Sequence, residues 1–276
     1  MNDRLIGLLN RFELHARVFQ AGPLCHSASF DAQDGLGYIH LLRSGKLKVN
    51  SAKQASFLLE EPSLFFYMEP TSHRLLPQDN DVDMVCASFD FGAGLRNPLS
   101  QALPDVLVLR LSDTPALTTS LDLLFTEAQA QHCGRQAVLD RLIEIIIVQL
   151  LRDLMDEKRI QVGLLAGLAE PKLAKAINAM HSEPSRAWTL EDLASVAGMS
   201  RARFATKFRD TVGTTPGSYL TEWRMGVAQS LLRRGKPVQL VASEVGYASA
   251  SALSRAFATQ VGVSPTDWKK KYVSEL

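Results

Sequence analysis

The last hundred residues of the chain contain an internal repeat, and this feature constrains the fold more than any other. Residues 193–198 (LASVAG) are matched by residues 241–246 (VASEVG) at an offset of 48. Further matches follow at an offset of 49, and they pair Phe208 with Phe257, Gly213 with Gly262, and Pro216 with Pro265. Two copies are too few to form a solenoid. The repeat therefore predicts a duplicated small helical domain.

Each copy has the pattern of a helix-turn-helix unit. A small residue, Ala194 or Ala242, permits two helices to cross closely, and the glycine four positions later accepts the positive φ of a tight turn. A serine that can cap the next helix follows, Ser200 in the first copy and Ser249 in the second. In such a unit the second helix enters the major groove of DNA. The pattern therefore indicates two DNA-reading helices.

The connection between the copies and the distribution of charge favour the same interpretation. Residues 219–234 have the apolar spacing of one continuous helix, which would hold the two units at a fixed distance. Successive major-groove surfaces on one face of DNA lie about 34 Å apart, so one polypeptide could read two of them. Residues 170–276 carry a net charge of +6 and residues 1–169 a net charge of −5. A tethered module that binds a polyanion would give this balance, and so would chance partition of surface charge.

Residues 170–276 contain the stretches LEDLA at 190–194, YLTEWRM at 219–225 and FATQVGVSP at 257–265. Together these stretches resemble the DNA-binding domain of the AraC/XylS family of bacterial transcription regulators. The resemblance places major-groove contacts at Ala202, Ala205, Thr206, Arg209, Ala250, Ser251, Ser254 and Arg255, and the basic face of the first copy adds Arg201 and Arg203. Alanine can contact a thymine methyl group but cannot hydrogen-bond a base edge. We therefore expect sparse direct readout, supplemented by readout of DNA shape.

The N-terminal half predicts a different architecture. Between about residues 24 and 111, short apolar runs bounded by turn-forming residues indicate antiparallel strands in a sandwich or barrel. Helical periodicity follows over residues 117–154. Its second helix has a broad apolar stripe, formed by Leu139, Leu142, Ile143, Ile146, Ile147, Leu150, Leu151 and Leu154. The stripe is interpreted either as the seam of a homodimer or as an ordinary intramolecular core face.

The N-terminal half also resembles the cupin-like regulatory domain that precedes such DNA-binding domains, through residues 38–45, 70–73 and 85–91. The expected fold class is α+β. It comprises a sensor domain over residues 1–155, with a cupin-like β-barrel and a helical dimerisation hairpin, a linker at 156–169, and an all-α DNA-binding domain at 170–276 with two helix-turn-helix motifs. Catalytic cupins hold a metal with a His-x-His motif. Position 42 is Leu here, so a dioxygenase-type site is not expected.

A different set of residues could hold zinc in the sensor domain. His40 and His73 fall where cupin barrels point ligands inward, and the resemblance to this subgroup of regulators places cysteines at Cys25 and Cys86. Two thiolates and two imidazoles are a suitable tetrahedral set for zinc. The alternative is two buried, inert cysteines and two ordinary histidines. Spacing along the chain does not decide between them.

The sequence as a whole predicts a transcription regulator, not an enzyme. It contains no phosphate-binding glycine loop, close acidic pair or nucleophilic triad order. The expected partners are double-stranded DNA, RNA polymerase and a second copy bound through residues 117–154, while the small-molecule effector is unknown. Three cysteines, the absence of a signal peptide and the charges that interrupt residues 142–154 predict a cytoplasmic, nucleoid-associated protein without membrane contact. The alternatives are a cupin metalloenzyme fused to a DNA-binding module and a regulator controlled by a protein partner.

Overall fold

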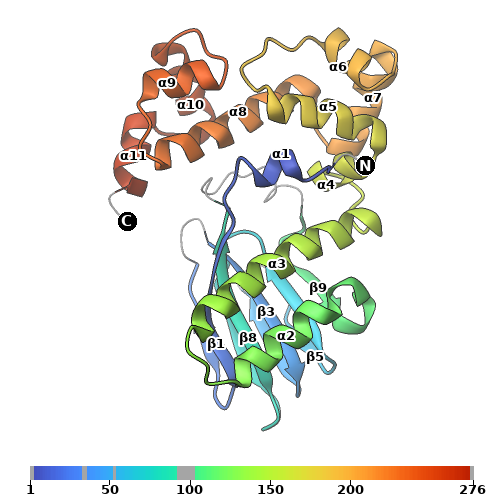
Figure 1. Cartoon of the computed structure of the whole chain (residues 1–276), viewed down its shortest axis with the longest axis vertical. Coiled ribbons are helices and arrows are strands. Elements are labelled where there is room, and N and C mark those ends of the chain that lie inside the picture. Colours follow the sequence, from blue (N-terminus) through green and yellow to red (C-terminus); the bar gives the residue numbers. More distant parts are fainter. Residues whose placement is uncertain (1–2, 33–35, 52–53, 92–102, 274–276) are drawn as a thin grey trace. The chain divides into compact units, whose positions relative to one another are not determined.

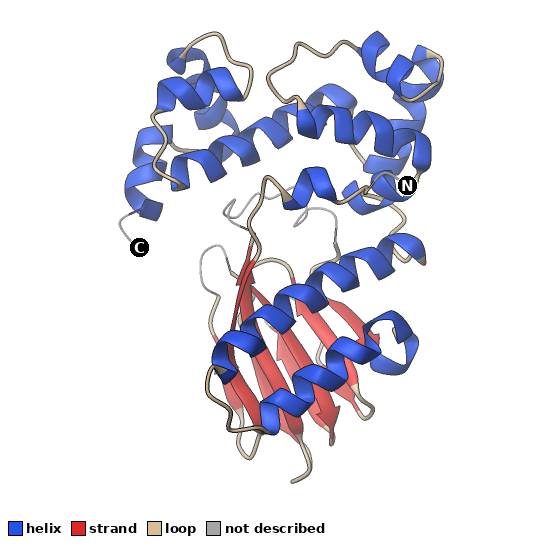
Figure 2. Ribbon diagram, viewed as in Figure 1, coloured by secondary structure: helices blue, strands red, loops and turns tan. Residues whose placement is uncertain are grey.

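The computed structural model describes residues 3–32, 36–51, 54–91 and 103–273, and it divides into two compact units (Figure 1). We call residues 14–90 and 103–154 the sheet unit. The helical unit comprises residues 3–13, Phe91 and residues 155–273. All the described strands belong to the sheet unit, and the regular elements of the helical unit are all helices (Figure 2).

Two antiparallel sheets form the sheet unit. The larger has the order β1-β8-β3-β6-β9 and the smaller the order β2-β7-β4-β5. The strands are β1 His15–Pro23, β2 Ala28–Phe30, β3 Gly37–Ser44, β4 Leu47–Ser51, β5 Phe57–Leu59, β6 Ser63–Tyr67, β7 His73–Pro77, β8 Asp83–Asp90 and β9 Leu107–Arg110. No ladder among the described strands joins one sheet to the other, so the closed barrel expected from the sequence is wrong. The chain instead changes sheets at tight turns such as Gly45, which has a φ of +85°.

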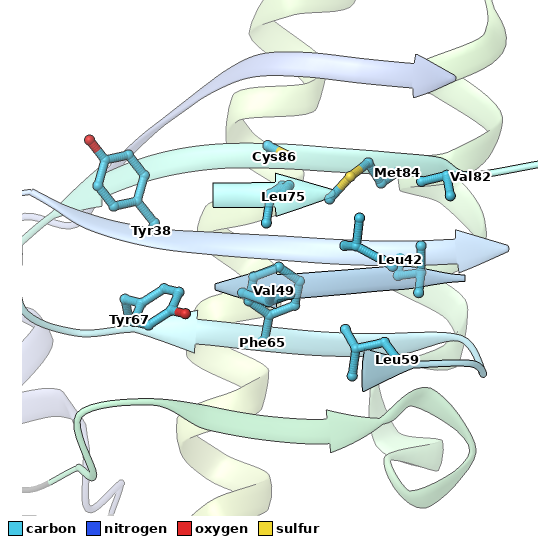
Figure 3. Close-up of a cluster of buried hydrophobic side chains, with 11 residues drawn as sticks. Tyr38, Leu42, Val49, Leu59, Phe65, Tyr67, Leu75, Val82, Met84 and Cys86 are labelled. Carbon is cyan, nitrogen blue, oxygen red and sulfur yellow. The ribbon is translucent and has the colours of Figure 1, made fainter. Parts of the chain in front are cut away.

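The core of the sheet unit includes a cluster of buried side chains drawn from both sheets (Figure 3). Successive residues of β3 point to opposite faces, and Tyr38, Ile39, His40, Leu41 and Leu42 are all buried. Both faces of the strand are therefore covered. One face contributes to the cluster, which contains Tyr38, Leu42, Leu47, Val49, Leu59, Phe65, Tyr67, Leu75, Val82, Met84 and Cys86.

Helices α2 (Thr118–Gln129) and α3 (Arg135–Asp156) follow two 3₁₀ turns, Leu111–Asp113 and Pro115–Leu117, and lie across one face of the larger sheet (Figure 1). Helix α3 also provides hydrogen-bond partners for backbone groups on the outer edge of β1. Asp140 Oδ1 accepts from the backbone N–H of Val18 at 2.7 Å, and Gln136 donates to the Val18 carbonyl at 2.7 Å. Among the described residues, no helix combines the length and the apolar character needed to cross a membrane.

The apolar stripe of α3 faces the interior of its own unit. Ile143, Ile146, Ile147 and Leu150 are fully buried within the single chain. Only Val138 and Ile145 among the large apolar residues of α3 are well exposed, at 41% and 48%. Placing the seam of a homodimer on the buried stripe was therefore wrong, because the stripe packs inside the subunit and has no surface left for a partner.

The helical unit contains eight helices from residue 164 onward. They are α4 Leu164–Ala169, α5 Pro171–Ser182, α6 Leu190–Val196, α7 Arg201–Val212, α8 Pro216–Arg233, α9 Val238–Glu244, α10 Ala250–Val261 and α11 Pro265–Val273. Helix α4 lies in the segment expected to be a linker. Its Leu164, Leu165 and Leu168 are buried, so residues 164–169 are part of the packed unit and not a flexible connection.

The first residues of the chain also pack in the helical unit, although the sequence interpretation assigned them to the sensor domain. This N-terminal segment, residues 3–13, contains the short helix α1 (Ile6–Leu9). Leu8 and Phe12 are fully buried, and the Phe12 ring meets the Trp223 ring edge-on with centroids 5.1 Å apart. The Arg4 guanidinium donates to the carbonyls of Leu168 and Ala169 at the end of α4. The N-terminal segment is therefore part of the hydrophobic core of the helical unit.

Candidate nucleic-acid interface

Two helix pairs, α6/α7 and α9/α10, repeat the same turn geometry. Gly198 and Gly246 have φ values of +62° and +83°, which favour glycine at both turns. In the first pair the backbone N–H of Met199 donates to the Ala194 carbonyl at 2.9 Å, and in the second Tyr247 donates to Ala242 at 2.8 Å. The repeat in the sequence is therefore a repeat in hydrogen bonding as well.

The second helix of each pair is anchored by apolar residues on its inner face. Phe204 and Phe208 of α7 are fully buried, as are Leu253 and Phe257 of α10. The capping residues differ between the copies: the Ser249 side chain accepts from the Ala252 N–H at 3.1 Å, whereas the Ser200 side chain makes no capping bond. Burial of one face leaves the opposite face of each helix exposed and available for a ligand.

The predicted contact residues of α7 divide into three groups. Ala202 and Arg203 are exposed, and the Arg203 guanidinium forms no ion pair with any residue of the described part of the chain. Arg201 is paired with Glu191 through Nε and Oε1 at 3.1 Å. Three residues, Ala205, Thr206 and Arg209, line a cavity of about 340 Å³ whose other walls include Trp188, Leu193 and Leu220. The structure therefore places these six residues on one helix, but their side chains differ in how freely they could contact DNA.

The predicted contact residues of α10 are mostly short. Ser251 and Arg255 are exposed, while Ala250 and Ser254 are half-buried. An ion pair with Glu244 would make the Arg255 guanidinium unavailable to DNA. The Glu244 carboxylate instead meets the Lys236 ammonium group at 2.7 Å. The Arg255 guanidinium is therefore not held by that carboxylate.

The proposed zinc ligands are only partly brought together in the sheet unit. His40 on β3 and His73 on β7 are buried, and their Nε2 atoms lie 2.8 Å apart. Cys86 is buried beside His40 in the ladder of β8 and β3, whereas Cys25 is exposed. No group of three or more His, Cys, Asp or Glu residues in the described ranges is arranged to hold a metal ion. The four-residue zinc site remains a prediction that this arrangement does not support.

The hydrogen bonds of the two histidines define their tautomers. His73 Nδ1 lies 2.7 Å from the Thr71 carbonyl, which can only accept, so Nδ1 carries the proton. The unprotonated His73 Nε2 must then accept from His40 Nε2–H, and His40 Nδ1 is left as a buried acceptor without a partner. Zinc-bound nitrogens in a tetrahedral site lie about 3.3 Å apart, so this contact has the length of a hydrogen bond and not of a shared ion. Burial also raises the pKa of the Cys86 thiol, which keeps it protonated.

Both histidines are neutral because burial lowers the pKa of each below its ordinary value, although the Thr71 carbonyl partly offsets the effect at His73. The unfolded chain therefore takes up protons first as the pH falls. We expect the sheet unit to have its full stability above about pH 6.5 and to lose it below that value, by at most about 1.4 kcal/mol per pH unit for each histidine. Hydrogen exchange of β3 and β6 amides at pH 7.5 and 5.5, corrected for intrinsic rates, measures this loss.

The matched variant for this pH dependence replaces both His40 and His73 by Gln. It should have lower protection at both pH values but a smaller difference between them, because the titrating groups are gone. Equal protection of the wild-type strands at the two pH values would contradict the prediction.

Comparison with known proteins agrees with this two-part architecture. The sequence matches the cupin family over residues 3–156 and the helix-turn-helix domain family over residues 193–271. A protein of Streptomyces lividans named as an AraC-like transcription regulator is 36% identical over 198 residues, which cover 70% of this chain and 65% of that relative. The chain belongs to the AraC family of transcription regulators.

Two further proteins are similar over most of their length. RclR of Escherichia coli K12, an RCS-specific HTH-type transcriptional activator, is 30% identical over 238 residues, or 84% of each chain. Among solved structures, unsaturated fatty acid bound wild-type ToxT from Vibrio cholerae covers 94% of both chains, with 14% identity and a TM-score of 0.43. The chain spans about two thirds of the length of the Streptomyces relative, 65%.

Sequence reasoning missed two parts of this AraC-family helical unit. The N-terminal segment was read only for its lack of a signal peptide, although Leu5, Leu8 and Phe12 have helical apolar spacing that could have indicated a buried face. Arg224 was quoted as part of a motif without a role. It donates to two backbone carbonyls, those of Pro184 at 2.7 Å and Arg186 at 2.8 Å. Such contacts between segments distant in sequence leave no periodic signal.

Proposed function

We propose that this AraC-family protein binds duplex DNA through two helix-turn-helix units, α6/α7 and α9/α10, and regulates transcription in response to a signal received by the sheet unit. The observation that carries the proposal is the duplicated turn, with a positive-φ glycine and the same backbone hydrogen bond in both copies. Helix α8 joins the two copies, as the sequence predicted. The geometry supports insertion of α7 and α10 into successive major grooves.

The exposed charges of α7 and α10 suit a polyanionic partner. The guanidinium groups of Arg203, Arg209 and Arg255 make no ion pair with any described residue, so each is available for a DNA phosphate or base. Arginine can contact guanine O6 and N7 with two hydrogen bonds, and it can equally hold a phosphate. The alanines at positions 202, 205 and 250 add surface shape and methyl contacts but no hydrogen bonds.

The wider assembly is part of the same proposal. RNA polymerase is the expected partner at a promoter, and the working site is then the bacterial nucleoid. If a second copy binds through the helices of residues 117–154, it does so through their outer faces, where Leu123, Val138 and Ile145 are 41–52% exposed. The rival interpretation as a cupin metalloenzyme gains no support from the sheet unit, since the described residues there provide a hydrogen-bonded histidine pair and no completed ligand set.

The proposal is tested by DNA binding of the full chain at several salt concentrations. Neutralisation of phosphates by lysine and arginine releases counterions, so the logarithm of the binding constant should fall linearly with the logarithm of salt concentration. Fluorescence anisotropy with a labelled library of duplexes, followed by selection of the tightest sequence, measures both the slope and the specificity. A folded chain that binds no duplex, or binds with no salt dependence, would overturn the assignment.

Arg255 supplies a sharper test of base reading. Its neighbours on α10, the exposed Ser251 and the half-buried Ser254, are too short for a bidentate contact with guanine. If Arg255 reads a base, Arg255→Ala should cost about 1–3 kcal/mol at one position of the selected site, relax the preference there and leave the salt slope nearly unchanged. If it holds a phosphate, binding should weaken uniformly and the slope should fall by about one.

The Arg255 comparison uses a panel of duplexes with single substitutions in the selected site. Ser251→Ala on the same helix is the control, since it removes one short side chain and no charge. Wild-type affinity and wild-type preference of the Arg255→Ala variant across the panel would exclude both forms of contact.

A further inference from the structure

One arginine of α8 holds the loop that precedes the first helix pair. Arg224 Nε donates to the Pro184 carbonyl at 2.7 Å, and one terminal nitrogen donates to the Arg186 carbonyl at 2.8 Å. Both acceptors belong to the loop of residues 183–189, which connects α5 to α6. The planar guanidinium presents its donors in a fixed fork, so the two bonds fix both the position and the orientation of the loop on α8.

The loop itself is internally braced. The Trp188 indole N–H donates to the Glu183 carbonyl at 3.0 Å, and the Arg186 guanidinium lies over the Trp188 ring at 3.9 Å. Thr189 then caps α6 in a reciprocal capping box with Asp192. The placement of the loop by Arg224 is therefore passed on to the start of α6, the first helix of the first pair.

The turn of the second helix pair rests on the same loop. A Cβ atom added to Gly246 would lie 2.8 Å from the Ser185 carbonyl oxygen, 2.9 Å from Ser185 Cα and 3.0 Å from the Arg224 side chain. Real Cβ atoms do not approach backbone this closely, so the turn between α9 and α10 is in direct contact with the loop only because residue 246 is glycine. Arg224 and Gly246 thus bring one loop into contact with both helix pairs.

The first copy provides the contrast. Gly198 occupies the equivalent turn and also has a positive φ, but a Cβ atom there would meet no atom within 4 Å. Backbone conformation alone accounts for glycine at position 198. At position 246 glycine is also required by the close contact with Ser185. Because only the second copy has this contact, we infer that the contact orients the two copies relative to each other.

We propose that Arg224 and Gly246 are positioning residues that set the distance and rotation between the two DNA-reading helices, and hence the one half-site spacing that the protein accepts. The inference rests on the proposed function, since it requires both helix pairs to bind DNA. Helix α8 fixes the length of the connection, but a helix can still bend and its ends can twist. The loop provides a second connection between the pairs. Two connections resist rotation of one helix pair relative to the other, whereas a single helix does not.

The experiment measures tolerance to half-site spacing with the full chain. The wild-type protein first selects a two-part site from a random duplex library, and base pairs are then inserted or removed between the half-sites. One base pair rotates the second groove by about 35°, so wild-type binding should weaken by about tenfold or more for each base pair. For Arg224→Gln and for Gly246→Ala, the affinities for the different spacings should differ from one another by no more than about threefold.

Gly198→Ala is the matched control, because it carries the same positive-φ strain without the contact to Ser185. It should retain the wild-type dependence on spacing even if its overall affinity falls. Affinity for a single isolated half-site should change by less than about twofold in Arg224→Gln, since no residue of α7 or α10 is altered. Circular dichroism checks that each variant is folded. If Arg224→Gln does not fold, Arg224→Lys replaces it, because lysine keeps the charge but lacks the forked donors of the guanidinium.

The outcomes separate the two proposals. If the wild-type chain selects no DNA, or selects only a single half-site, the proposed two-site function fails and the positioning role fails with it. If the wild-type chain selects a two-part site but Gly246→Ala and the folded Arg224 variant keep the wild-type dependence on spacing, the positioning role alone is overturned.

Discussion

Replacing Phe12 by alanine is expected to lower the free energy of unfolding of the helical unit by about 3–5 kcal/mol, the range for truncation of a fully buried phenylalanine. Phe12 is fully buried, and its ring packs edge-on against Trp223, which is itself fully buried. The backbone on either side is held by hydrogen bonds, since the Arg11 carbonyl accepts from Ser230 and the Arg11 guanidinium donates to the Ser182 carbonyl. The site therefore has little freedom to collapse around a smaller side chain.

The tryptophans make this loss measurable in the intact chain. All three, Trp188, Trp223 and Trp268, lie in the helical unit, so intrinsic fluorescence during urea unfolding reports on that unit and not on the sheets. Phe19→Ala is the matched control, because Phe19 lies in the sheet unit and is 44% exposed. A Phe12→Ala midpoint that coincides with the wild-type midpoint would show that the N-terminal segment contributes nothing to the core.

The same contacts predict that a fragment limited to the two helix pairs is destabilised. Residues 170–276 contain both helix pairs, but they omit the N-terminal segment and α4. Without these residues, His181, whose ring stacks on Trp223 at 3.4 Å, would lose the cover provided by Gly7. A fragment of residues 155–276 should therefore be less stable than the same unit in the full chain, and a synthetic peptide of residues 1–14 should restore part of the loss.

The helical unit shows what a sequence can predict about a fold of this kind. The two turns, the continuous helix α8 and the anchors Phe208 and Phe257 could all be predicted, because each depends on residues only a few positions apart. The helix α4 could not, because its six residues are too short for periodicity to distinguish them from an apolar linker. The positions of Arg224 and Phe12 were missed for a related reason, since their partners lie about 40 and 210 residues away in sequence.

In the sheet unit, less of the structure could be predicted from the sequence. Strands β3, β6 and β8 could be predicted from their apolar runs, but β1 could not, because half of its residues face solvent and it contains an irregularity between Val18 and Gln20. Closure of the barrel could not be judged, since no sequence pattern states whether the outer strands pair with each other. The candidate ligands His40 and His73 do meet, yet Cys25 remains exposed. A sequence can contain residues suited to bind a metal without folding so that all of them meet.

The substitution Ile146→Glu distinguishes a core helix from a subunit seam. Ile146 is fully buried within the single chain, whereas Ile145, about 100° away around the axis of α3, is 48% exposed. A carboxylate placed there would have to be desolvated without a partner, so we expect the sheet unit to lose more than about 4 kcal/mol of stability and to unfold or aggregate. The loss should be visible in far-ultraviolet circular dichroism. Any subunit dissociation, measured by light scattering, should follow from the unfolding and not precede it.

The neighbouring substitution Ile145→Glu is the control for this prediction. Its side chain is 48% exposed, so the free energy of unfolding should change by no more than about 0.5 kcal/mol. If α3 contacts a second copy through its outer face, Ile145→Glu should give folded monomers while Ile146→Glu gives unfolded protein. A folded, monomeric Ile146→Glu variant would reverse this assignment, because it would mean that the apolar stripe faces a partner and that its burial in the single chain is not what holds the sheet unit together.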